Sequence, residues 1–242
     1  PKGKVRVPKD AEVLDASGAW ILPGLVDAHI HFFQSGGLYT RPDILDLRSL
    51  VPYAGKEIPE IQARLDDTLT RYLRCGVTSV VDVGGPFWNF EVRDRARRSP
   101  AAPRVAVAGP LISTWQPEAL LVEDAPILKA STPEEARAMV AKQAPFAPDL
   151  VKIWYIIQPG DEPDRHMPMV RAVAEEAHAR GLRLAVHATQ LETARCAVQA
   201  GADILVHSID DKPVDDAFLD LLRVRGTLYT TTLMVMERYK RA

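Results

Sequence analysis

The amino-acid sequence predicts an α/β fold, an incomplete (β/α)8 barrel of about seven strands in which strand eight is absent. Two observations lead to this prediction. Short, β-branched apolar segments alternate with segments whose apolar residues have helical spacing, as expected for a parallel sheet. No GxGxxG motif or phosphate-binding loop follows any of these apolar segments, which disfavours a doubly wound nucleotide-binding sheet.

The expected strands are continuous apolar runs, as is typical of strands that are buried on both faces. They span residues 21–32, 78–84, 104–109, 150–155, 183–188, 204–208 and 227–233. Long connections follow the first and third strands, at 33–59 and 110–132. In a barrel, loops at this end of the strands form the active site.

Four helices are expected between the strands, over residues 58–76, 132–144, 167–181 and 191–201. The first has Pro59 in its first turn and ends at Gly76. The second begins with Thr132 as its cap, and Glu135 stands three residues later, which is the pattern of a capping box.

Residues 1–20 differ from the rest of the chain, because two short extended pieces flank the turn-like sequence DASG. We expect two parts: a small β-structure segment over 1–20 and the hydrolase-type barrel over 21–242. The two cysteines, Cys75 and Cys196, are expected to be small buried residues and not a disulfide.

Composition limits the partners of the protein. A net charge of −2 provides no field that would attract nucleic acid or anionic lipid. No apolar run approaches the roughly 20 residues of a membrane span. We therefore expect a cytoplasmic protein that acts on a small molecule and binds neither nucleic acid nor membrane, while homo-oligomer formation stays open.

Five polar residues stand near the ends of the expected strands. His29 and His31 lie two apart in the first strand, so both project to the same face. Lys152, His187 and His207 each lie near the carboxyl end of a later strand, where barrels carry catalytic residues. One strand histidine is more often a hydrogen-bonded core residue than a ligand. Four of them with a lysine, at matched depth, favour a metal site.

The ordered set PGLVDAHIHF, LVKIW, LAVHA and LVHSI resembles the amidohydrolase superfamily of metal-dependent hydrolases. The similarity covers nearly the whole chain and is greatest to the branch of imidazolonepropionase-like proteins and prolidase-type dipeptidases. The resemblance implies a distorted (β/α)8 barrel with a small β-sandwich, of which residues 1–20 would be a part.

The resemblance also implies a role for each of the five residues. His29 and His31 would bind one divalent metal ion, most often zinc, and His187 and His207 a second one. Lys152, carbamylated by carbon dioxide, would bridge the two ions, so that Lys152 and His207 are the expected catalytic residues. The site would use a metal-bridging hydroxide. The strand-four lysine favours this binuclear type over deaminases, which typically lack it.

The expected reaction is hydrolysis of an amide-type C–N bond in a dipeptide, an N-acyl amino acid or a cyclic amide. Trp154, Tyr155 and His166 are candidate substrate contacts. Two alternatives stay open: hydrolysis of an ester, carbamate or organophosphate by the same metal pair, and a metal-binding barrel fragment without turnover.

The family places an aspartate at the end of strand eight, and no such strand follows residues 227–233. Asp210 and Asp211 follow the sixth strand and are expected to shape a loop, while Asp82 is expected to support structure. We therefore expect these 242 residues to be the interior of a longer chain.

Overall fold

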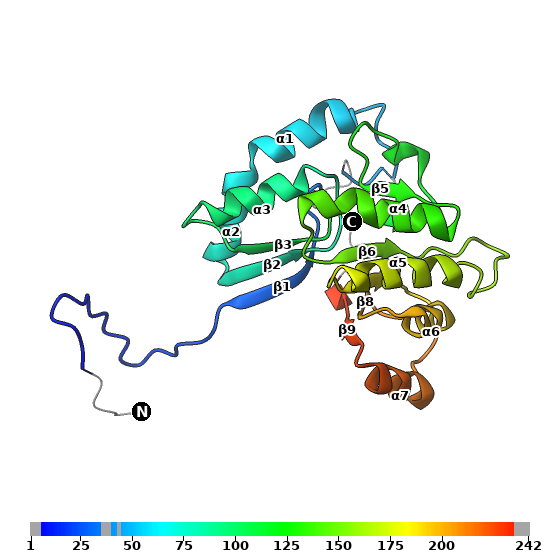
Figure 1. The fold of residues 1–242 in the computed structure, drawn as a ribbon. Coiled ribbons are helices and arrows are strands. Elements are labelled where there is room, and N and C mark those ends of the chain that lie inside the picture. Colours follow the sequence, from blue (N-terminus) through cyan, green and yellow to red (C-terminus); the bar gives the residue numbers. More distant parts are fainter. Residues whose placement is uncertain (1–5, 35–39, 43–44, 235–242) are drawn as a thin grey trace.

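The computed structural model describes residues 6–34, 40–42 and 45–234. Its strands form a curved row with the helices outside it (Figure 1). Every strand pair in the described residues is parallel, which confirms the predicted α/β barrel class.

All seven predicted strands are present, although most are shorter than expected. They are β1 (Leu25–Ile30), β2 (Val77–Asp82), β3 (Arg104–Val107), β6 (Val151–Trp154), β7 (Leu184–His187), β8 (Ile204–Val206) and β9 (Leu228–Thr230). Two short strands that the sequence did not predict, β4 (Leu111–Ser113) and β5 (Ile127–Lys129), lie within the long connection that follows β3.

The row of strands is divided into two sheets between β3 and β4. One sheet has the order β1-β2-β3 and the other the order β5-β4-β6-β7-β8-β9. Only three residues separate β3 from β4, and one of them is Gly109, with φ of +77°. A Cβ atom at Gly109 would lie 2.5 Å from the Phe90 ring, so glycine is required where the chain passes from one sheet to the other.

The predicted helices are present, with one break. Residues 58–76 form α1 (Ile58–Ala63) and α2 (Leu65–Arg74), because Arg64 leaves the helical conformation at φ −100° and ψ 8°. The others are α4 (Pro133–Gln143), α5 (Met167–Ala179) and α6 (Leu191–Ala200). Thr132 caps α4 by accepting a hydrogen bond from the backbone N–H of Glu135, at 3.2 Å.

Two helices lie outside the predicted set, α3 (Asn89–Arg97) and α7 (Asp216–Arg225). Short helical turns occur at Tyr53–Glu57, Glu118–Leu120 and Ala144–Phe146. The cysteines are free, as expected, but Cys75 is exposed and Cys196 half-buried, so the prediction that both are buried was wrong. Cys75 lies just past the end of α2, beyond the helix face that packs on the strands.

The main core lies between the second sheet and helices α4 to α7. Val151 and Ile153 of β6, together with Leu184 and Val186 of β7, are fully buried in it. Helix α5 supplies Val170, Val173 and Ala177 at helical spacing. This packing fixes the strands whose carboxyl ends carry the predicted site residues.

Residues 6–24 contain no described helix or strand and run away from the body of the molecule (Figure 1). The side chain of Trp20 is 91% exposed. The assignment of residues 1–20 to a small β-sandwich stays a prediction, and residues 1–5 lie outside the described part. None of the described helices is long and apolar enough to cross a membrane.

Arg93 connects α3 to the start of β6. Its guanidinium is buried and donates hydrogen bonds to the carbonyl oxygens of Ala147 (2.6 Å) and Phe146 (3.0 Å). It also contacts the Asp149 carboxylate, whose Oδ2 accepts the Val107 N–H at 2.9 Å. The two sheets are thus connected through one buried cation.

We predict that Arg93→Met lowers the free energy of unfolding by about 3 kcal/mol, because it removes the hydrogen bonds that a buried guanidinium donates to two carbonyl oxygens. Arg97→Met, on the same helix but exposed, should change it by no more than about 0.5 kcal/mol. Urea unfolding measures both values. Equal effects would contradict the anchoring role of Arg93.

Candidate functional site

The five predicted site residues lie together at the carboxyl ends of four strands. His29 is in β1 and His31 follows it, Lys152 is in β6, His187 ends β7, and His207 follows β8. All five line one cavity of about 530 Å³. The structure therefore brings together all five residues of the predicted metal set.

The imidazole rings are in direct contact. The Nε2 atoms of His29 and His31 are 3.3 Å apart. The ring of His207 lies 4.5 Å from that of His29 and 4.4 Å from that of His187, measured between centroids. The end of β1 thus meets the ends of β7 and β8 across the mouth of the barrel.

Two of the rings are oriented by a hydrogen bond at Nδ1. His31 Nδ1 lies 2.7 Å from the Gly84 carbonyl oxygen, which only accepts, so Nδ1 carries the proton and Nε2 presents a lone pair to the cluster. His207 Nδ1 lies 3.0 Å from Thr232 Oγ1, and the His207 backbone has φ of +78°. A non-glycine residue in this region is strained, and such strain is typical of functional sites.

Burial keeps the imidazoles uncharged. Burial, and to a smaller extent positive charge at Lys152, His31 and Arg41, lowers the pKa of His207 to about 3. Burial also moves the pKa values of His29 and His187 far below their usual range. Neutral imidazole is the form that binds metal ions.

Lys152 is the unusual member of the cluster. Its side chain is 1% exposed, and Nζ is buried without a hydrogen-bond partner. Burial alone lowers the pKa of the Lys152 amine to about 7. An amine with this pKa is about half in the neutral, nucleophilic form near pH 7, whereas an exposed lysine is almost fully protonated.

The donors fit a divalent metal ion by their chemistry. His29 Nδ1 and Lys152 Nζ are buried polar atoms without partners, which an added ligand would satisfy. Among the described residues, no three His, Cys, Asp or Glu side chains already form a metal-binding group. The rings instead contact each other, and Lys152 lines the same cavity.

Another part of the cavity lining is apolar. It is formed by side chains from β4, β5, the loop between them and β6: Leu111, Leu120, Pro126, Ile127 and Trp154. Trp115 packs on Trp154, with 5.2 Å between ring centroids. Asp210 is the one carboxylate among the described residues that line the cavity. The unpredicted strands β4 and β5 thus form part of this wall.

Of the three candidate substrate contacts, the structure places only Trp154 in the cavity. Tyr155 is buried on the other face of β6, and its hydroxyl donates to the Pro163 carbonyl at 2.6 Å. His166 packs near the Tyr155 ring and Asp161, away from the cavity. Strand alternation separates Tyr155 from Lys152 and Trp154.

Three further residues hold the surroundings of the site by hydrogen bonds. Asp211 accepts the Leu191 N–H at 2.9 Å at the start of α6, which confirms its structural role. Thr232 and Gly84 hydrogen-bond the rings of His207 and His31 from the ends of neighbouring strands, and only the fold brings them to these rings.

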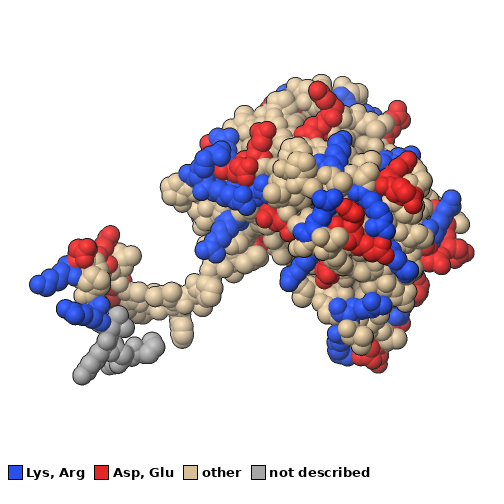
Figure 2. Space-filling model, in the orientation of Figure 1, with Lys and Arg blue, Asp and Glu red and all other residues tan. Residues whose placement is uncertain are grey.

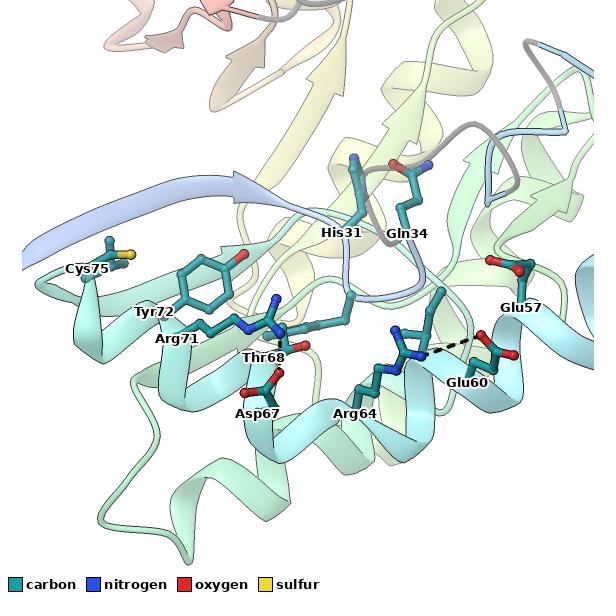
Figure 3. Close-up of a pocket in the computed structure, with 13 residues that line it drawn as sticks. His31, Gln34, Glu57, Glu60, Arg64, Asp67, Thr68, Arg71, Tyr72 and Cys75 are labelled. Carbon is teal, nitrogen blue, oxygen red and sulfur yellow. Dashed lines mark ion pairs between the residues drawn. The ribbon is translucent and has the colours of Figure 1, made fainter. Parts of the chain in front are cut away.

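A second cavity, of about 610 Å³, lies on the other side of His31 (Figure 3). Its far wall consists of charged residues of α1 and α2, including the ion pairs Arg64–Glu60 and Arg71–Asp67. His31 is the one histidine among its described lining residues. On the face shown in Figure 2, basic and acidic side chains are interspersed.

The amidohydrolase family model matches residues 20–242. The chain belongs to the amidohydrolase family. An uncharacterised protein of Mycobacterium tuberculosis is 26% identical over 231 residues, which are 92% of this chain and 53% of that protein. The chain therefore spans about half the length of the curated relatives it matches.

Solved structures of amidohydrolases share the fold. One described as an amidohydrolase has a TM-score of 0.74 and 22% identity, over 99% of this chain and 61% of that chain. A putative prolidase from Bifidobacterium longum has a TM-score of 0.67 and 25% identity, over 94% of this chain and 50% of that chain. These similarities confirm the predicted superfamily and barrel class.

We predict that His207 makes the stability of the metal-free protein depend on pH. The unfolded chain protonates this ring near pH 6.5 and the folded chain only near pH 3, so stability falls as the pH falls through this window. His207→Asn should reduce the slope of unfolding free energy between about pH 4 and about pH 6 by about 1.4 kcal/mol per pH unit.

Urea unfolding at several pH values measures both slopes. Asp82, buried with a pKa raised to about 7, opposes the histidines in the same range, but it is present in both proteins and cancels in the comparison. Identical slopes would contradict the burial of a neutral His207.

Proposed function

We propose that this protein is a metal-dependent hydrolase of amide-type C–N bonds. One observation carries the proposal: four imidazoles and a desolvated, unpartnered lysine amine line one cavity at the carboxyl ends of the barrel strands. Membership of the amidohydrolase family supports it.

The donor chemistry assigns the ligands. His29 and His31 would hold one divalent ion, and His187 and His207 would hold a second, with zinc the best match to imidazole donors. Lys152 would bridge the two ions as a carbamate. When bound, such ions would activate water and polarise the carbonyl of the scissile amide.

Carbamylation follows from the surroundings of Lys152. The neutral amine adds to carbon dioxide, forms an N–C bond and loses its proton. A buried donor without a partner thereby becomes an anionic oxygen ligand. The lowered pKa of the Lys152 amine supports this reaction, because only the unprotonated amine has the lone pair that it requires.

The chain's own residues would bind and orient the substrate. The apolar side chains of Leu111, Leu120, Ile127 and Trp154 line the same cavity as the histidines and would accept a non-polar group beside the scissile bond. The resemblance to a putative prolidase agrees with a dipeptide or N-acyl amino acid. We therefore favour amide substrates with an apolar side chain over polar ones, and cyclic amides belong to the same class.

We predict opposite effects of Lys152→Met on stability and on metal binding. Replacing a buried, unpartnered amine by an apolar group of similar length should raise the unfolding free energy of the metal-free protein by about 1–3 kcal/mol. The same change should abolish binding of the second zinc ion. Urea unfolding and metal analysis after dialysis against zinc and bicarbonate measure the two effects.

Lys129→Met, an exposed position on β5, is the matched control and should change neither quantity. A Lys152→Met protein that is less stable than wild type and still binds two zinc ions would contradict both the burial argument and the bridging role.

The function is tested with a substrate panel: apolar dipeptides, N-acyl amino acids and lactams, beside ester, carbamate and phosphotriester analogues. We expect release of free amine from the amides, dependent on zinc and bicarbonate and absent in Lys152→Met. Turnover restricted to esters or phosphotriesters would favour that alternative. Zinc-loaded protein without any turnover would contradict an enzymatic role.

A further inference from the structure

A second group of buried polar residues lies behind His31, outside the proposed ligand set. Asp82 ends β2, Asn89 begins α3, and the side chains of both are completely buried. Neither residue lines the cavity that the histidines share. Burying a carboxylate in a protein is unfavourable unless hydrogen bonds compensate for the lost hydration.

The Asp82 carboxylate accepts three hydrogen bonds. Its Oδ1 accepts the Gly84 N–H at 3.0 Å. Its Oδ2 accepts the Phe32 N–H at 3.2 Å and the Asn89 side-chain amide at 2.6 Å. The carboxylate thus joins the turn after β2 to the residue that directly follows His31.

These contacts hold both ends of one hydrogen bond at the site. The Gly84 carbonyl accepts the proton of His31 Nδ1 at 2.7 Å, and the Gly84 N–H is bound to Asp82. The backbone that carries the His31 ring is fixed one residue later, at Phe32. Donor and acceptor are therefore both held by the same carboxylate.

The turn between them is closely packed and has no space for a side chain. Gly84 has φ of +145°, and a Cβ atom there would lie 2.6 Å from Leu111 Cγ. At Gly85 it would lie 2.1 Å from Asn89 Nδ2. Asn89 packs directly against the glycine pair that presents the carbonyl, so it fixes the turn by contact as well as through Asp82.

We propose that Asp82 and Asn89 are positioning residues that hold His31 in the tautomer with the proton on Nδ1 and the lone pair on Nε2. The use of that lone pair for a metal ion rests on the proposed function, whereas the tautomer itself does not. Hydrogen-bond partners behind metal-binding histidines commonly act in this way, and their loss weakens metal binding about 10–100-fold.

The test is Asp82→Asn, which keeps the shape of the side chain but replaces one accepting oxygen by a donor. Nitrogen-15 NMR of the metal-free protein, with histidine labelling and His31 assigned by His31→Asn, reports the tautomer. We expect Nδ1–H in the wild type and a substantial Nε2–H population in Asp82→Asn. Zinc affinity should fall about 10–100-fold.

Asp149→Asn is the matched control, because Asp149 also accepts a backbone N–H between strands but lies away from the histidines. It should leave the His31 tautomer unchanged. Asn89→Leu, which keeps the Asp82 carboxylate and its backbone contacts, should shift the tautomer in the same direction and serves if Asp82→Asn does not fold.

The tautomer decides the proposal. A His31 ring that stays Nδ1-protonated in both Asp82→Asn and Asn89→Leu overturns it, whatever the effect on stability. A wild-type protein that binds no zinc would contradict the proposed function instead, and the tautomer measurement on metal-free protein would still decide the role of Asp82.

Discussion

The burial of the Lys152 amine is the constraint on which the arrangement of the site depends. A protonated ammonium at 1% exposure, surrounded by imidazoles, would have neither solvent nor a carboxylate to balance its charge. Burial favours the neutral amine, and burial likewise favours neutral rings at His29, His187 and His207. Four rings and a lysine can therefore lie together without mutual repulsion, which charged forms would not allow.

The packed barrel makes this burial stable. β6 places Lys152 between Val151 and Ile153, which are fully enclosed by the core beneath α4 and α5. Across the mouth, His207 is held in a left-handed conformation by its backbone bond to Thr230 and its ring contact with Thr232. The rigid packing around β6 thus keeps the Lys152 amine desolvated, while the hydrogen bonds across the mouth keep the His207 backbone in its strained conformation. Such strain and desolvation are typical of functional sites.

The sequence predicted the features that follow from local pattern. The seven predicted apolar segments contain the seven main strands. Strand alternation predicted that His29 and His31 share a face, and both line one cavity. Alternation also separates Tyr155 from that cavity, so its prediction as a substrate contact neglected the same rule. The short strands β4 and β5 were not predictable in this way, because three residues carry too little periodicity.

Contacts between distant segments had no local signal at all. Nothing near Asp82 in the sequence indicates that its carboxylate meets the backbone of Phe32, fifty residues earlier. The same holds for His207 and Thr232, whose ring contact depends on β8 and β9 being neighbours. The Nδ1 atoms of His31 and His207 are bound by Gly84 and Thr232, which follow the adjoining strands β2 and β9. The parallel order of the strands, and not the sequence near each histidine, therefore orients these rings before any ligand arrives. Such preorganisation would reduce the conformational entropy that metal binding must otherwise overcome. The barrel therefore contributes to the chemistry of the site through the register of neighbouring strands as much as through the residues at their ends.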